Sequence, residues 1–147
     1  MQFIDLAAQR ARIGDRIDLA VSKVIREGKY ILGPEVAEFE RKLADYVGVK
    51  HVVACANGTD ALLIPLFAFG VGRGDAVFCP SFTFAATAEV VALAGAEPVF
   101  IDIDPDTYNI DIAQLKAAIK AIKAEGRLTP KAIIPVDLFG LAADYSA

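Results

Sequence analysis

Apolar residues recur along the chain at intervals that predict alternating helices and strands. Between residues 13 and 25 they fall every three or four positions, which predicts an amphipathic helix. Helix-breaking residues between Gly28 and Pro34 end this helix. A second amphipathic helix is predicted after them, with apolar positions up to Val47, and Gly48 ends it as a C-terminal glycine.

The remainder alternates short apolar runs with helical segments. The predicted strands cover residues 51–56, 76–79, 98–103 and 132–136. The predicted helices cover residues 57–69, 83–94 and a segment that begins at Asp111. Because the helix over 57–69 is apolar on every face, we expect it to be buried. The alternation predicts a three-layer α/β/α fold with a mostly parallel sheet, whose ligands bind beyond the carboxyl ends of the strands.

The composition predicts that part of the apolar surface is covered, either by further sequence or by a partner subunit. Apolar residues make up 55% of the 147 residues and the mean hydropathy is +0.45. The longest apolar run, residues 61–72, is too short to span a membrane and contains Pro65. Residues 1–5 lack the basic start of a signal peptide, so we expect a cytoplasmic protein.

The charged and metal-binding residue types exclude several functional classes. The net charge is −4 and the charges are mixed, which argues against a nucleic-acid partner. Cys55, Cys79 and His51 lack metal-ligand spacing, so no metal site is expected. The acidic residues within 102–106 are interpreted as a turn that follows a strand.

The loop Asn57-Gly58-Thr59-Asp60 joins a predicted strand to a predicted helix. Gly58 allows a ligand to approach the backbone, Thr59 adds a hydroxyl donor, and the helix N-terminus favours an anion. These features fit a phosphate-binding loop. The alternative is an ordinary helix start at which Asn57 or Thr59 caps the first turn.

Aromatic residues mark two further loops. Phe82 and Phe84 follow a strand and could stack on a flat heterocycle, or both could belong to the core. Their spacing points them in different directions, so at most one is expected to stack. Tyr30 lies in a loop between breaking residues, which fits either a ligand contact or a packed connector. The glycines of residues 70–74 follow a helix, so they indicate a turn rather than a dinucleotide-binding loop.

Six segments, in this order, resemble the DegT/DnrJ/EryC1/StrS aminotransferases. They are FIDL (residues 3–6), YILGPEV (30–36), ANGTDAL (56–62), PSFTFAATA (80–88), DIDPDTYN (102–109) and IIPVDLFG (133–140). The resemblance implies the N-terminal part of the large domain of a type I pyridoxal-phosphate transferase. It also implies a homodimer whose active sites lie at the subunit interface. Residues 1–34 would form an N-terminal helix and substrate-side loop, and residues 35–147 a partial cofactor-binding domain.

The resemblance also implies roles for individual residues. Gly58 and Thr59 would hold the phosphate of pyridoxal 5'-phosphate (PLP), and Phe84 would stack on its ring. Tyr30 and Leu32 would lie near the sugar substrate. No catalytic residue is assigned, because the family's Schiff-base lysine is expected after the last residue of this chain. We therefore expect the chain alone to be inactive.

The activity implied is transfer of an amino group, commonly from glutamate, to a keto group of a nucleotide-linked sugar. PLP would alternate with pyridoxamine 5'-phosphate. The overall likeness favours a UDP-2-acetamido-3-keto uronic acid used for surface polysaccharide. Asp137 replaces a histidine or serine often found in the family, and Pro65 interrupts a helix, which are two departures. A C4-keto sugar aminotransferase, a dehydratase of the family and a noncatalytic regulatory relative remain alternatives.

Overall fold

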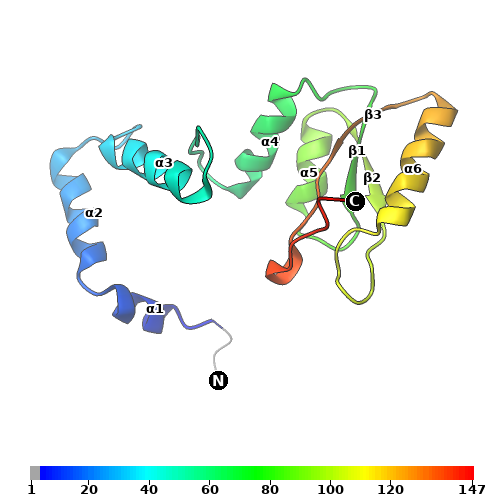
Figure 1. Cartoon of the computed structure of the whole chain (residues 1–147). Coiled ribbons are helices and arrows are strands. Elements are labelled where there is room, and N and C mark those ends of the chain that lie inside the picture. The colour runs from blue at the N-terminus through cyan, green and yellow to red at the C-terminus, as the bar shows by residue number, and fades with distance from the viewer. Residues whose placement is uncertain (1–3) are drawn as a thin grey trace. The chain divides into compact units, whose positions relative to one another are not determined.

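The computed structural model describes residues 4–147, which form two compact units. One unit ends at Ala54, and the other runs from Cys55 to Ala147. Phe3, the first residue of the FIDL segment, lies outside the described residues. The domain boundary expected after residue 34 stays a prediction. The first unit contains α1 (Leu6–Ile13), α2 (Arg16–Glu27) and α3 (Pro34–Val47) (Figure 1).

The helices of the first unit begin and end at residues that satisfy their terminal backbone groups. Asp5 caps α1 by accepting a hydrogen bond from the Ala8 N–H at 2.9 Å. Gly14, at φ 63°, separates α1 from α2, so the helix predicted over 13–25 is shifted and α1 was not predicted. Gly48 ends α3 in the left-handed conformation, as predicted. The Lys23 ammonium lies 2.8 Å from the Glu35 carboxylate and links α2 to α3.

The second unit is built around a small parallel sheet. Its helices and strands are α4 (Gly58–Ala68), β1 (Asp75–Pro80), α5 (Ala86–Leu93), β2 (Glu97–Ile101), α6 (Ile112–Glu125), β3 (Thr129–Ile133) and the short 3-10 helix η1 (Leu138–Gly140). The strand order is β2-β1-β3, and both outer strands run parallel to β1. The carboxyl ends of the three strands therefore lie at one edge of the sheet.

Strand β1 supplies side chains to a separate core on each face of the sheet. Val77 packs on one face with residues of α4 and α5, including Leu66 and Val90. Phe78, the next residue, packs on the other face in a cluster with Leu115 of α6. Figure 1 shows α5 on one side of the strands and α6 on the other. The predicted three-layer α/β/α arrangement is confirmed.

The strand predicted over residues 51–56 is wrong for this structure. These residues are irregular, and the side chain of Val53 is 80% exposed. The Ala54 N–H donates to the Glu40 carboxylate at 2.8 Å instead of joining a sheet. A short apolar run becomes a strand only where a neighbouring strand takes up its backbone hydrogen bonds. No such neighbour lies beside it in the described part of the chain.

Helix α4 also differs from its prediction. We expected it to be buried, but Leu66 alone is buried among the helix residues, and Phe67 is 57% exposed. The cause is that α5 covers only one side of α4 within its unit. The helix passes through Pro65, and the Phe69 N–H donates to the Pro65 carbonyl at 2.9 Å.

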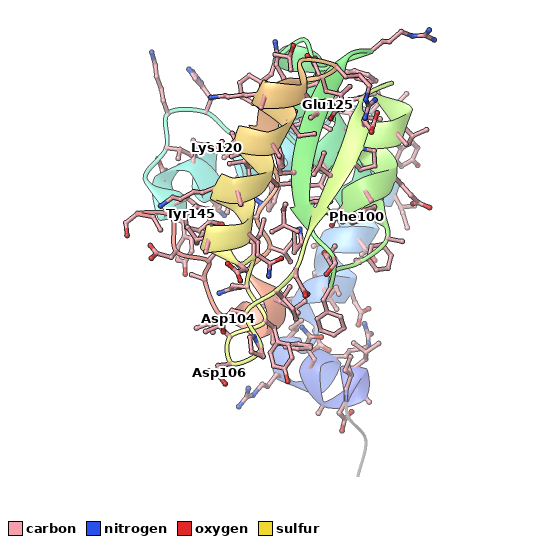
Figure 2. The ribbon with its side chains drawn as sticks, turned by 90° about the vertical axis from the view of Figure 1, so that its right-hand side faces the viewer. Phe100, Asp104, Asp106, Lys120, Glu125 and Tyr145 are labelled. Atoms are coloured by element: carbon pink, nitrogen blue, oxygen red, sulfur yellow. The ribbon has the colours of Figure 1, made fainter. Side chains whose placement is uncertain are left out.

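Side-chain hydrogen bonds stabilise the segments that flank the strands. Arg127 donates two hydrogen bonds to Glu97, at 2.7 and 2.8 Å, between the segment after α6 and β2. This pairing lowers the pKa of Glu97 below its ordinary value. Figure 2 shows Asp104 and Asp106 in the loop beyond β2, and their turn forms as predicted because Asp104 accepts the Asp106 N–H at 2.9 Å.

Among the described residues, no helix combines the length and apolar character that a membrane crossing requires. The cytoplasmic location expected from the sequence stays a prediction.

Replacing Phe78 by alanine should destabilise the second unit strongly. Its side chain is 1% exposed, and its removal leaves a cavity between β1 and α6, at a cost of about 3–5 kcal/mol. Phe100→Ala is the matched control, because this side chain on the adjacent strand β2 is 58% exposed. The measurement is urea unfolding followed by circular dichroism. Equal losses in the two variants would contradict the assignment of the core.

Candidate functional site

The second unit contains a cavity of about 500 Å³ at the carboxyl edge of its sheet. Three parts of the chain line it: the N-terminus of α4, the loop between β1 and α5, and the segment after β3. The lining residues are Gly58, Thr59, Leu62, Thr83, Phe84, Ala86, Thr87, Ile134, Pro135, Val136 and Asp137. The phosphate loop and one of the aromatic residues predicted from the sequence therefore lie at the same cavity.

The N-terminus of α4 presents backbone donors to this cavity. Asn57 is the cap of the helix, because its side-chain oxygen accepts the Asp60 N–H at 2.9 Å. The first-turn N–H groups of Gly58 and Thr59 have no acceptor within the helix. The cap interpretation is confirmed for Asn57, and Gly58 and Thr59 line the cavity, where their contact with a phosphate stays a prediction.

Gly58 is not required by the packing of its own chain. Its φ is outside the left-handed region. A methyl group added at this position would meet no atom within 4 Å apart from its chain neighbours and the backbone of its own helix. Glycine therefore leaves open space at the helix N-terminus, where the helix dipole attracts an anion. The space and the donors fit a phosphate group.

The two phenylalanines of the loop after β1 point to different places, as their spacing predicted. Phe84 lines the cavity, and its side chain is 79% exposed, so a ring face is open to a ligand. Phe82 instead lies 5.9 Å from Tyr108, measured between ring centroids. Tyr108 in turn makes an edge-on contact with Phe139 at 6.1 Å. These contacts join the loops that follow the three strands.

Two threonines of the cavity were not predicted from the sequence. Thr83 and Thr87 share a hydrogen bond of 3.0 Å between their hydroxyl groups, and Thr87 is buried. The pair connects the loop after β1 to the first turn of α5. The signal that could have found them is their spacing of four residues across a helix start, which brings side chains together.

Asp137 lines the cavity from the segment that follows strand β3. Its Oδ1 atom accepts hydrogen bonds from the Ala143 N–H at 2.9 Å and from the Tyr145 hydroxyl at 3.0 Å. The hydrogen bond to Asp137 raises the pKa of Tyr145, because it stabilises the protonated phenol. The sequence marked Asp137 as a departure from the family pattern but did not place it at the cavity.

Tyr30 and Leu32, the predicted substrate-side residues, belong to the first unit. The Tyr30 hydroxyl donates to the Ile25 carbonyl at 3.1 Å, and the residue is 65% exposed. Leu32 adopts φ 47° and is 80% exposed. A non-glycine residue in this conformation is uncommon and indicates a loop held in a specific shape. Their contact with a substrate stays a prediction.

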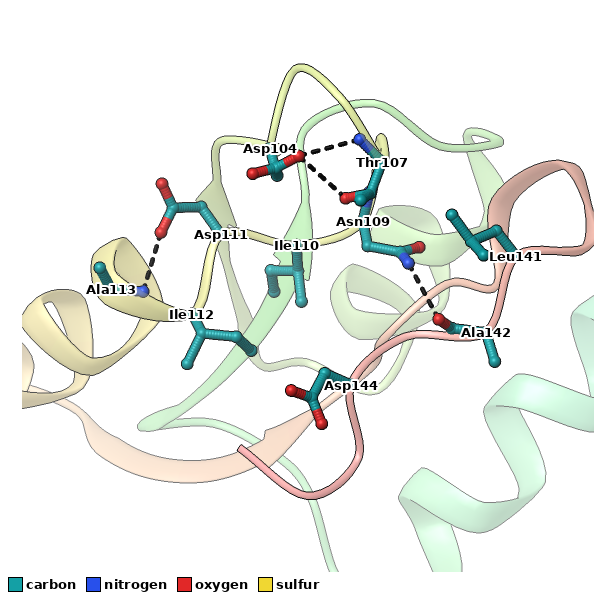
Figure 3. Close-up of a pocket in the computed structure, with 10 residues that line it drawn as sticks. All are labelled: Asp104, Thr107, Asn109, Ile110, Asp111, Ile112, Ala113, Leu141, Ala142 and Asp144. Carbon is teal, nitrogen blue, oxygen red and sulfur yellow. Dashed lines mark hydrogen bonds between the residues drawn. The ribbon is translucent and has the colours of Figure 1, made fainter.

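A second cavity, of about 440 Å³, lies between the loop after β2 and residues 141–144 (Figure 3). Its acidic side chains are engaged locally. Asp104 accepts hydrogen bonds from the backbone N–H and hydroxyl of Thr107, which lower its pKa, and Asp111 caps α6. The Asn109 amide donates to the Ala142 carbonyl at 3.0 Å. These bonds stabilise the loops.

Comparison with known proteins decides the family. The model of the DegT/DnrJ/EryC1/StrS aminotransferase family matches residues 11–147. The chain belongs to this family. Its members depend on PLP. The fold of the family member from Brucella abortus, known from a crystal structure, superimposes with a TM-score of 0.97 at 72% identity. That match covers 99% of this chain and 39% of the Brucella chain.

Two relatives of the present chain carry functional names. The UDP-2-acetamido-2-deoxy-3-oxo-D-glucuronate aminotransferase of Pseudomonas aeruginosa is 56% identical over 149 aligned residues, which cover all of this chain. The pleiotropic regulatory protein of Geobacillus stearothermophilus is 45% identical over 98% of the chain. The chain spans 39% of the length of the first relative and 37% of the second.

Replacing Gly58 by alanine should weaken phosphate binding without weakening the fold. The added methyl group enters the open space at the α4 terminus, so the affinity for inorganic phosphate should fall about tenfold. Isothermal titration calorimetry measures the affinity, and thermal unfolding checks the fold. Gly72→Ala is the control, since its methyl group would meet only the Ala94 carbonyl at 3.8 Å. An unchanged phosphate affinity in Gly58→Ala would refute the cradle.

Proposed function

We propose that this chain supplies the phosphate cradle and one ring contact of the PLP site in a nucleotide-sugar aminotransferase. The observation that carries the proposal is the cavity of about 500 Å³ at the carboxyl edge of the sheet, which Gly58, Thr59 and Phe84 line together. The family's dependence on PLP gives this cavity a matching cofactor, with a phosphate at one end and a flat ring.

The residues present fit this group chemically. The N–H groups of Gly58 and Thr59 would bind the phosphate, supported by the α4 dipole. The exposed ring of Phe84 would pack against the pyridine ring and exclude water from it. The Thr83–Thr87 pair holds the loop that carries Phe84 against α5. When bound, PLP supplies an electron sink and carries the amino group between donor and acceptor.

The substrate we propose is a UDP-2-acetamido-3-keto uronic acid, aminated with glutamate as donor for surface polysaccharide. The support is the name and the 56% identity of the Pseudomonas relative. Tyr30 and Leu32 would contact this sugar. A regulatory function is the second candidate, since the Geobacillus relative, at 45% identity, carries a regulatory name.

A homodimer is part of the proposal. Large apolar side chains of the second unit are exposed, among them Phe67 and Phe69 of the α4 region and Leu93 of α5. Water-exposed apolar surface of this kind favours association with further protein. A second subunit, together with sequence that the relatives have and this chain does not span, would cover it.

A chimera tests the activity. Residues 1–147 would replace the matching segment of the Pseudomonas aminotransferase, which aligns with the whole chain. We expect the chimera to aminate the UDP-linked 3-keto uronic acid with glutamate, because the cradle residues come entirely from this chain. Liquid chromatography with mass spectrometry of the amino sugar measures the product.

The control is the same chimera with Gly58→Ala, which should need a higher PLP concentration for half-maximal activity. A chimera that prefers a C4-keto UDP-sugar would contradict the proposed substrate. A folded chimera that binds PLP but aminates neither sugar would contradict the enzymatic proposal and favour the regulatory one.

The chain alone should bind PLP without a specific covalent bond. None of the cavity residues in the described chain is a lysine, so no amine lies in position for a one-to-one adduct. Borohydride reduction followed by peptide mass spectrometry should find no lysine labelled stoichiometrically. The chimera is the positive control, with one labelled lysine expected in its Pseudomonas portion. A single stoichiometric label in the 147-residue chain would overturn this prediction.

A further inference from the structure

The cavity carries one charged residue among those that line it in the described chain, and that residue is Asp137. We propose that Asp137 determines which phosphorylated ligand the cavity accepts, by requiring a hydrogen-bond donor on the ligand beyond its phosphate. The inference rests on the proposed function, because it takes the α4 terminus as the phosphate cradle.

The carboxylate of Asp137 is held in place before any ligand binds. The Ala143 N–H and the Tyr145 hydroxyl both donate to Oδ1, at 2.9 and 3.0 Å. An ionised carboxylate offers about four acceptor positions, so two donors leave capacity for a ligand. Because both bonds reach it from residues 143–145, the carboxylate is fixed from outside the cavity. A fixed acceptor loses little conformational entropy when a donor arrives.

Charge explains why this acceptor would discriminate between ligands. The cradle at Gly58 and Thr59 attracts an anion, whereas Asp137 contributes a negative charge to the same cavity. No lysine or arginine lines the cavity in the described residues to offset it. A second anionic group is therefore repelled, and an ammonium, hydroxyl or ring N–H group is attracted. The favoured ligand combines a phosphate with such a donor.

Tyr145 is the positioning residue in this arrangement. Its hydroxyl donates to Asp137 at 3.0 Å, and this bond raises the pKa of the phenol above its ordinary value. Its ring is 70% exposed, so replacing it by phenylalanine removes the hydroxyl without opening a core. The carboxylate would keep its charge in that variant but lose one of its two anchors.

The test compares three ligands on the 147-residue chain by isothermal titration calorimetry. They are inorganic phosphate, pyridoxamine 5'-phosphate and 4'-deoxypyridoxine 5'-phosphate, which lacks the amine. Asp137→Asn should weaken pyridoxamine 5'-phosphate about tenfold, the size of a lost charge-assisted hydrogen bond. The same variant should bind inorganic phosphate as tightly as the wild type or a few-fold more tightly, because a repulsive charge is gone.

Opposite changes for the two ligands separate a ligand contact from a loss of fold, which would weaken both. Tyr145→Phe should weaken pyridoxamine 5'-phosphate by less than Asp137→Asn and leave phosphate binding unchanged. If Asp137→Asn weakens pyridoxamine 5'-phosphate alone, the amine is the donor that Asp137 accepts. If it weakens both pyridine ligands equally, the donor is a hydroxyl or the ring N–H.

The outcomes also separate this inference from the proposed function. Binding of all three ligands that Asp137→Asn leaves unchanged would overturn the role of Asp137 and leave the phosphate cradle intact. Failure of the wild-type chain to bind any of the three ligands, with its circular dichroism spectrum showing a folded protein, would overturn the cradle and the inference together.

Discussion

The second unit is organised around strand β1, which is hydrogen-bonded along both edges and buried on both faces. Ala76, Val77, Phe78 and Cys79 are almost inaccessible to water, and alternate residues enter the two core clusters. Burial on both sides requires a helix layer on each face, which α5 and α6 provide. Parallel pairing with β2 and β3 then brings three chain segments to the same edge of the sheet.

That edge is where the candidate site lies, and the parallel arrangement is the reason. Phe84 follows β1, Asp137 follows β3, and the N-terminus of α4 adds Gly58 from a third segment. The residues are 26 to 79 positions apart in sequence, as their numbers show. Parallel pairing places the segments after β1 and β3, which carry Phe84 and Asp137, at the same edge of the sheet. Ligands of open parallel sheets bind at this position for the same reason.

Backbone groups and side chains contribute different features to the candidate site. Gly58 contributes open space and helix-terminal donors, which suit an anion of any identity. Phe84 contributes an apolar surface that suits any flat ring. Neither distinguishes closely related phosphorylated ligands. The carboxylate of Asp137, anchored by Tyr145, is the feature of the cavity that carries both charge and direction. The proposed specificity would therefore depend on the hydrogen bond between Asp137 and Tyr145.

Local sequence determined the elements whose own residues stabilise them. The glycine at position 48 ended α3, Asp111 capped α6, and the acidic turn after β2 formed through Asp104, because each uses hydrogen bonds within a few residues. The order of the motifs also indicated the family and the phosphate loop. The apolar run over residues 51–56 could not form a strand on the same basis, since a strand needs a distant partner for its backbone groups.

Tertiary structure alone decided which side chains share the cavity and how they are held. The pattern of residues could not show that Phe82 turns toward Tyr108 while Phe84 faces the cavity, nor that Thr83 pairs with Thr87. It marked Asp137 as unusual but not as a cavity residue anchored by Tyr145. Such contacts depend on how strand ends and loops pack in three dimensions. The spacing of apolar residues within one segment does not show which distant side chain that segment contacts.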